Sequence, residues 1–103
     1  MRLIKPDNYL PSELYLSKIA DAMSHPFRRK ILEMLLNSEI STRSELLNYS
    51  KLSKVAIYNH VRILINADLI ECIYHIHFEE LRLNYSALAE MKNYMDEMLS
   101  KYQ

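Results

Sequence analysis

The chain of 103 residues contains no glycine. A Gly-rich phosphate-binding loop is therefore excluded, because such a loop needs backbone that approaches the phosphate closely. Every turn must use Asn, Asp, Ser, Pro or a strained residue. The single cysteine, Cys72, excludes an intrachain disulfide. No apolar run has the length of a signal peptide or a membrane span, so we expect a soluble cytoplasmic protein.

The chain also lacks net charge, and a neutral chain alone gives no indication of a nucleic-acid partner. The charge is nevertheless unevenly distributed. Residues 1–67 carry ten Lys and Arg against six Asp and Glu, whereas residues 68–103 carry three against seven. A chain of this size buries only about 60–65% of its surface, so we expect a partner to cover any exposed apolar face.

The spacing of apolar residues and turn formers predicts one mostly helical α+β domain over residues 1–103, of the order ααααββα. Residues 1–11 are expected to form an extended arm. The expected helices cover about residues 12–23, a segment from Pro26, and residues 43–49, 53–66 and 86–103. The apolar runs over residues 67–76 and 78–84 predict a β-hairpin.

Local signals predict where these helices begin. Thr42 and Glu45 have the spacing of a capping box. Ser53 and Ser86 are expected to cap the last two helices. His25, which precedes the proline at the start of the second helix, is expected to cap or to pack.

The helix over residues 53–66 has two distinct faces. Ile57, Val61 and Leu64 lie within about 40° of one another and form a core stripe, whereas Asn59 and Arg62 lie on the opposite side. Arginine pairs with guanine and asparagine with adenine in a major groove. The competing interpretation is an ordinary solvated helix face, which has a similar composition. His60, about 60° from the core stripe, is expected to contact phosphate or to have a structural role.

The last predicted helix carries an apolar seam. Leu88, Met91, Met95, Met98 and Tyr102 are separated alternately by three and four residues, which is the spacing of a two-heptad coiled-coil seam. Such a stripe can pack on its own domain, on a second copy, or on both. We favour a homodimer.

A group of metal-ligating residue types lies in the predicted hairpin. Cys72, His75, His77 and Glu79 could form a metal or redox site only if a bend brought them together, because Cys72 has the opposite strand parity to the two histidines. We favour ordinary hairpin residues. We expect no metal, no cofactor and no catalysis, since no nucleophile, base and orienting acid occur together.

Two segments have a distinctive order of residues, DAMSHPFRRKILEMLL (21–36) and SELLNYSKLSKVAIYNHVRILINADLIE (44–71). They resemble the ArsR-type winged helix-turn-helix repressors, and the spacing from Ile70 to LRLN (81–84) equals the length of that family's wing. The resemblance covers about residues 14–100. It implies a dimeric DNA-binding regulator in which the helix from Ser53 enters the major groove, the hairpin is the wing, and the first and last helices pair the subunits. Members repress promoters and often respond to a metal, an oxidant or a small ligand.

The chain departs from this family at several positions. Lys51 and Asp68 stand where the family has glycine, and Lys51 is expected to be strained by about 1 kcal/mol. The wing tip lacks the family's basic residues and its glycine. Glu79 and Glu80 would repel phosphate if they faced DNA.

The sequence therefore predicts a homodimeric, DNA-binding transcriptional repressor that is not an enzyme. The alternative is a winged-helix module that binds proteins and has little or no affinity for DNA. The expected DNA-binding residues are Arg43, Lys51, Ser53, Lys54, Val55, Tyr58, Asn59, His60 and Arg62. The expected dimerisation residues are Leu14, Leu88, Met91, Tyr94, Met95, Met98, Leu99 and Tyr102.

Overall fold

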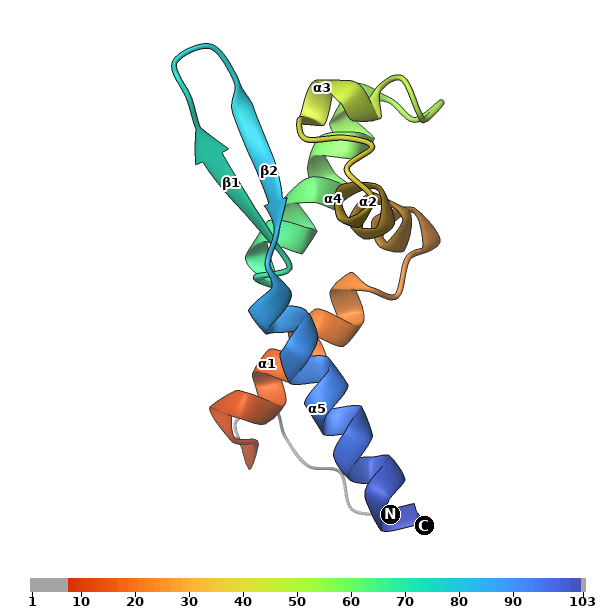
Figure 1. Cartoon of the computed structure of the whole chain (residues 1–103), viewed down its shortest axis with the longest axis vertical. Coiled ribbons are helices and arrows are strands. Elements are labelled where there is room, and N and C mark those ends of the chain that lie inside the picture. The colour runs from red at the N-terminus through yellow and green to blue at the C-terminus, as the bar shows by residue number, and fades with distance from the viewer. Residues whose placement is uncertain (1–7, 103) are drawn as a thin grey trace.

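A computed structural model describes residues 8–102 (Figure 1). The elements are α1 (Pro11–Ala22), α2 (Pro26–Leu36), α3 (Arg43–Leu46), α4 (Lys54–Asn66), β1 (Ile70–Tyr74), β2 (Glu79–Leu83) and α5 (Tyr85–Tyr102). The predicted order ααααββα is confirmed. Most of the expected arm, residues 1–11, lies outside the described residues.

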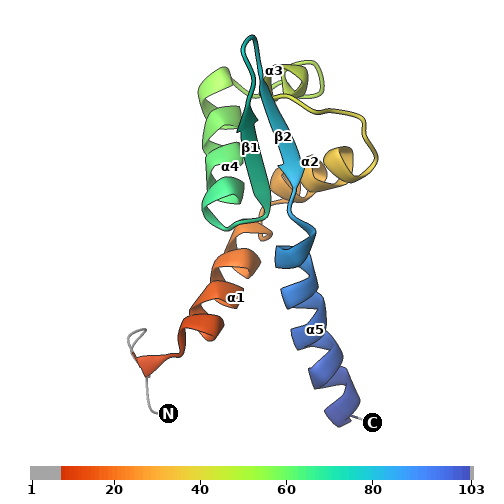
Figure 2. The ribbon, with the colours of Figure 1, turned by 60° about the vertical axis from the view of Figure 1, so that its left-hand side comes forward.

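The molecule is elongated, measuring 49 × 29 × 27 Å. Helices α2, α3 and α4 and the β1–β2 hairpin form one end, with α4 running beside the hairpin (Figure 2). Helices α1 and α5 extend from the other end and diverge from each other. Of the described helices, none is long and apolar enough to cross a membrane.

One hydrophobic core joins the elements. Helix α1 contributes Ile19 and Ala22, and α5 contributes Ala87 near its first turn. The remaining α5 residues are half-buried or exposed. The core therefore holds only the start of α5, and the rest of this helix extends past the domain.

Most of the predicted helix starts are confirmed. The Thr42 hydroxyl accepts from the Glu45 N–H, and Ser53 Oγ accepts from the Ala56 N–H at 3.2 Å. The side chain of His25 accepts from the Phe27 N–H at 3.0 Å. The prediction for α5 was wrong: Oδ1 of Asn84 accepts from the Ser86 N–H, so α5 begins earlier, at Tyr85.

Helix α3 is shorter than expected. The prediction of residues 43–49 was wrong in its end, because α3 ends at Leu46. The next three amides, from Leu47 to Tyr49, donate to carbonyls three residues earlier rather than four. The chain after α3 therefore continues as tight turns.

Two of the described helices, α2 and α4, are followed by a non-glycine residue in the left-handed backbone region. Ser38 follows α2 with φ of 58°, and Asp68 follows α4 with φ of 61°. After α4, the Leu69 N–H donates to the Leu64 carbonyl and the Asp68 N–H to the Ile65 carbonyl, which is the hydrogen-bond pattern of a Schellman motif. The strain expected at Lys51 was wrongly placed, because Lys51 is not among the residues with positive φ.

The hairpin is also shorter than the predicted runs, because the Schellman motif after α4 occupies residues 68–69 and a turn occupies residues 75–78. Cys72 pairs with Leu81, and Tyr74 pairs with Glu79. The Leu81 N–H also donates to the Ser41 carbonyl at 2.7 Å, which ties β2 to the segment before α3. His75 and His77 lie in the turn, so the strand parity expected for them does not apply.

Candidate nucleic-acid interface

Helix α4 separates its apolar and polar residues as predicted. Ile57, Val61 and Leu64 are buried against the other elements. Asn59 and Arg62 are exposed, and within residues 8–102 neither side chain has a hydrogen-bond partner. Val55 is 70% exposed. The outer face of α4 therefore offers a free amide, a free guanidinium and a small apolar group to a ligand.

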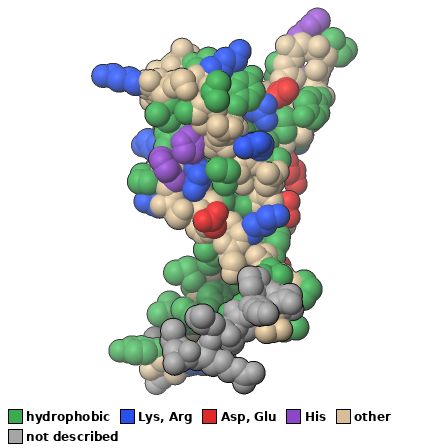
Figure 3. Space-filling model, turned by 180° about the vertical axis from the view of Figure 1, so that it is seen from behind, with side chains coloured by type: hydrophobic (Ala, Val, Ile, Leu, Met, Phe, Trp, Pro, Cys, Tyr) green, Lys and Arg blue, Asp and Glu red, His purple; other side chains and the backbone are tan. Residues whose placement is uncertain are grey.

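The N-terminal part of α4 carries a second group of exposed residues. The Tyr58 ring contacts two cations, with Cζ of Arg43 4.9 Å and Nζ of Lys54 5.8 Å from the ring centre. Lys51 and Ser53 are exposed in the segment that leads into α4. Seen from behind, Lys and Arg side chains are distributed over the upper half of the molecule (Figure 3). This surface suits the phosphates on either side of a groove.

Arg43 joins three elements. It begins α3, its Nη1 lies 3.1 Å from Oε2 of Glu79 on β2, and its guanidinium stacks on Tyr58 of α4. The Nε atom of Arg43 is buried without a partner in the described part of the chain. Arg43 thus fixes the wing relative to α3 and α4 as well as adding charge.

The two wing glutamates, which we expected to repel phosphate, are both paired. Glu79 forms an ion pair with Arg43, and Glu80 lies 2.9 Å from Nε2 of His75 and 2.7 Å from Nε of Arg82. The hydrogen bonds from Arg82 and His75 lower the pKa of Glu80. The repulsion expected between these two glutamates and DNA phosphates is therefore largely offset by the basic side chains that pair with them.

His60 packs against the start of α2. Its ring centre lies 4.5 Å from that of His25 and 5.3 Å from that of Phe27. Its Nδ1 is buried, and among the residues that the structure describes no hydrogen-bond partner reaches it. Burial, followed by the nearby His25 and Arg28, lowers the pKa of His60, which favours the neutral ring. The geometry supports the structural alternative for His60.

The hairpin side chains that could ligate a metal do not come together at one point. The Cys72 thiol donates to Oε2 of Glu79 at 3.6 Å, whereas His75 pairs with Glu80 and stacks on Phe78. Burial, followed by the charge of Glu79, raises the pKa of the Cys72 thiol. Within residues 8–102, no group of three His, Cys, Asp or Glu side chains is placed to hold a metal ion.

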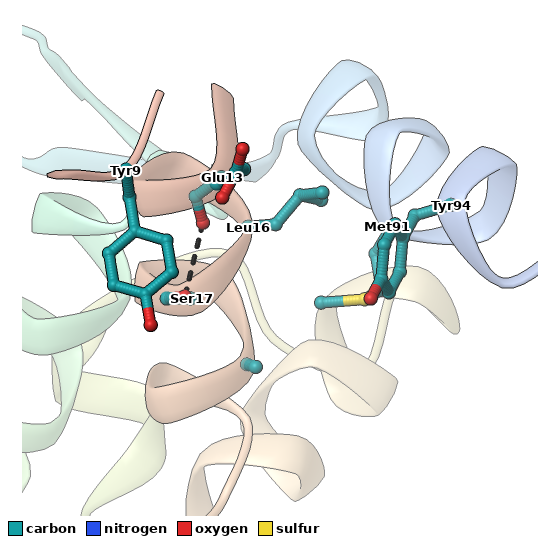
Figure 4. Close-up of a pocket in the computed structure, with 7 residues that line it drawn as sticks. Tyr9, Glu13, Leu16, Ser17, Met91 and Tyr94 are labelled. Atoms are coloured by element: carbon teal, nitrogen blue, oxygen red, sulfur yellow. Dashed lines mark hydrogen bonds between the residues drawn. The ribbon is translucent and has the colours of Figure 1, made fainter. Parts of the chain in front are cut away.

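The second candidate surface lies on α1 and α5. An open groove of about 350 Å³ separates them, lined by Leu16 and Ala20 of α1 and by Met91 and Tyr94 of α5. Leu16 faces Met91 and Tyr94 across the groove (Figure 4). Leu88 and Met91 pack partly on the core. The other expected dimerisation residues are exposed, namely Leu14, Tyr94, Met95, Met98, Leu99 and Tyr102.

Known proteins are similar to this chain in sequence and in the arrangement of its elements. The model of the bacterial regulatory protein arsR family matches residues 25–71. An uncharacterized HTH-type transcriptional regulator of Methanocaldococcus jannaschii is 34% identical over 84 residues, which cover 82% of this chain and 86% of that protein. The chain belongs to the ArsR family. It is a DNA-binding transcriptional regulator, and the family consists of regulators rather than enzymes.

Solved ArsR structures share the fold. An ArsR-like transcriptional regulator from Rhodococcus sp. RHA1 superposes with a TM-score of 0.78 at 19% identity, over 90% of this chain and 87% of that one. The crystal structure of another ArsR family transcriptional regulator gives a TM-score of 0.79 at 18% identity, over 87% and 92%. The predicted winged helix-turn-helix fold is confirmed.

Sequence reasoning missed the link between Arg43 and Glu79. Arg43 was expected to contact DNA and Glu79 to repel it, but no pattern in the sequence indicated that the two side chains pair. The only signal in the sequence was the opposite charge of the two residues.

Proposed function

We propose that this ArsR family protein is a homodimeric repressor that inserts α4 into the major groove of its operator. The observation that carries this proposal is the outer face of α4, where Asn59 and Arg62 are exposed and have no side-chain partner among residues 8–102, while the opposite stripe is buried. Arg62 then pairs with guanine and Asn59 with adenine, and Val55 contacts a thymine methyl.

The residues around the N-terminus of α4 hold the DNA backbone in this proposal. Lys51, Ser53, Lys54 and Tyr58 are exposed there and donate to phosphate oxygens. Arg43 has a different part, because Glu79 and Tyr58 already engage it. It orients Tyr58 and the wing, and it contributes only part of its charge to phosphate.

The second copy packs on α1 and α5. Met95, Met98 and Leu99 are each more than half exposed, and they continue a seam whose first members touch the core. Water-exposed apolar surface on this scale favours association, and two identical seams satisfy a two-fold interface. The dimer places two α4 helices about one DNA turn apart. The dimer acts in the cytoplasm, where the promoter is accessible. A dimer bound at the promoter blocks transcription.

A protein-binding module is the second candidate. It is favoured by the exposed apolar wing tip, where Tyr74 is 74% and Ile76 is 94% exposed. Such a module has no need of the free amide and guanidinium on α4, so α4 distinguishes the two candidates.

The test begins with selection of bound duplexes from a random pool, followed by fluorescence anisotropy over a salt series. We expect one enriched palindromic sequence and binding that weakens steeply with salt, because Lys and Arg release counterions from DNA. Asn59→Ala and Arg62→Ala should each cost about 1–3 kcal/mol of binding free energy. Lys30→Ala, an exposed change on α2, is the matched control. No enrichment, and no duplex binding at low salt, would support the protein-binding module instead.

A further inference from the structure

The tip of the wing is apolar and exposed. Between β1 and β2, the His75 N–H donates to the Phe78 carbonyl at 2.8 Å, and the two rings stack with centres 4.5 Å apart. This turn presents Ile76, which is 94% exposed, and His77 beyond it. The hairpin projects from the same end of the molecule as α3 (Figure 1).

The charge around the tip is compensated within the wing. Glu80 is held by His75 and Arg82, and Glu79 is held by Arg43. The turn over residues 75–78 itself contains no Lys, Arg, Asp or Glu. The tip consequently has neither the charge to bind phosphate nor a free carboxylate to be repelled by it.

The wing is fixed relative to the recognition helix. Arg43 contacts Glu79 of β2 and Tyr58 of α4, and the Leu81 N–H is bonded to the Ser41 carbonyl. When α4 occupies a major groove, the position of the tip beside the duplex is therefore determined. Through Arg43, the base of the wing adjoins Tyr58 on the proposed DNA-binding face, and this continuity favours DNA as the occupant of the tip over a protein.

We propose that Ile76 acts as an apolar wedge that inserts from the minor groove between two base pairs and bends the operator. This inference rests on the proposed function of α4. Minor-groove proteins often insert such side chains, partly unstacking a step and kinking the duplex by about 20–90°. His77 beside the wedge donates to the acceptors that A·T pairs present in the minor groove. Pyrimidine–purine steps deform most easily, so the outer flank of each half-site carries a TA step.

The test uses the selected duplex with a fluorophore pair at its ends and 2-aminopurine at the flanking TA step. We expect the wild-type protein to shorten the end-to-end distance and to raise 2-aminopurine fluorescence. Ile76→Ala should remove both signals and lower affinity about tenfold, since the wedge contact is lost. The salt slope should stay unchanged, because no phosphate contact is removed. Leu36→Ala, an exposed apolar change on α2, should change neither signal.

The outcomes separate this inference from the proposed function. A duplex that is bound but stays straight and stacked, or an Ile76→Ala variant that still bends it, overturns the wedge and leaves the role of α4 intact. It also favours a protein as the occupant of the tip. A protein that binds no duplex overturns both proposals.

Discussion

Helices α4 and α5 have similar amphipathic patterns but opposite exposure. In α4 the apolar stripe of Ile57, Val61 and Leu64 is buried within the domain, so the face left in solvent is polar. In α5 the corresponding seam leaves the domain after Met91, and Met95 and Met98 are each 52% exposed. A helix whose apolar stripe is buried within its own chain can present specific polar groups to a ligand. A helix whose apolar stripe is exposed needs another surface to cover it, and in our account that surface is a second copy.

The largest expected effect comes from charging the α5 seam. Met95→Lys together with Met98→Lys should convert the dimer to a monomer, because burying each unpaired ammonium costs several kcal/mol. Operator affinity should fall at least 100-fold, since the paired half-sites can no longer be bound at once. Sedimentation velocity and anisotropy measure the two effects.

The matched control adds the same charge on the other side of α5. Asn93→Lys with Ser100→Lys lies about 160° from the seam, and it should leave the dimer intact. Equal loss of the dimer in both variants would contradict the assignment of the seam.

Shortening one apolar side chain in each stripe to alanine compares the two helices directly. Ile57→Ala should lower the free energy of unfolding by about 2–5 kcal/mol, because it leaves a cavity in the core. Met98→Ala should cost less than about 1 kcal/mol in a background kept monomeric by Met95→Lys alone, because the Met98 side chain is half exposed in the single chain. Urea unfolding of both variants in that background measures the contrast, and equal losses would show that α5 packs on its own domain.

The backbone just after α4 is expected to be strained, because the left-handed residue there is Asp68 and not glycine. Asp68 adopts φ of 61°, where a non-glycine residue costs about 1 kcal/mol. Asp68→Gly and Ser38→Gly should each stabilise the protein by up to about that amount. Lys51→Gly is the control, and it should not stabilise because Lys51 is not in this backbone region. A destabilised Asp68→Gly variant in urea unfolding would show that the carboxylate contributes more than the strain costs.

The smallest effect concerns the contact of α4 with α2. The pKa of His60 is lowered in the folded state, so the unfolded chain binds a proton first as the pH falls. Its contribution to stability is complete above the unfolded pKa of about 6.5 and is lost as the pH falls below it. Urea unfolding at pH 7.5 and 5.5 should show this loss in the wild type, and a reduced loss in His60→Gln. His77→Gln, an exposed change, should retain the wild-type loss, and an unchanged loss in His60→Gln would argue against this role.

Much of the fold was predictable because local rules determine it. Helical spacing located the α4 stripe, and serine, threonine and proline signals located the starts of α2, α3 and α4. The start of α5 was predicted wrongly, with Ser86 as its cap, because Asn84 and Ser86 both carry a suitable capping oxygen and only the backbone path selects between them. Likewise, the left-handed residues are Ser38 and Asp68 and not Lys51, because α2 and α4 end in Schellman motifs whereas α3 continues as tight turns.

The candidate site was less predictable. The outer face of α4 follows from its periodicity, so the exposure of Asn59 and Arg62 was expected. The pairing of Arg43 with Glu79 joins elements far apart in sequence, and no periodicity relates them. The operator bases that these residues contact stay a prediction, since an isolated helix face specifies residue types and not the DNA sequence.

The spacing of the half-sites tests most directly the claim that α4 contacts DNA while α5 pairs the subunits. The measurement is the affinity for the selected operator and for the same duplex with five base pairs inserted between its half-sites. This insertion turns the second half-site by about half a turn. Our account predicts that affinity falls to that of a single half-site, and equal affinity for both duplexes would contradict it.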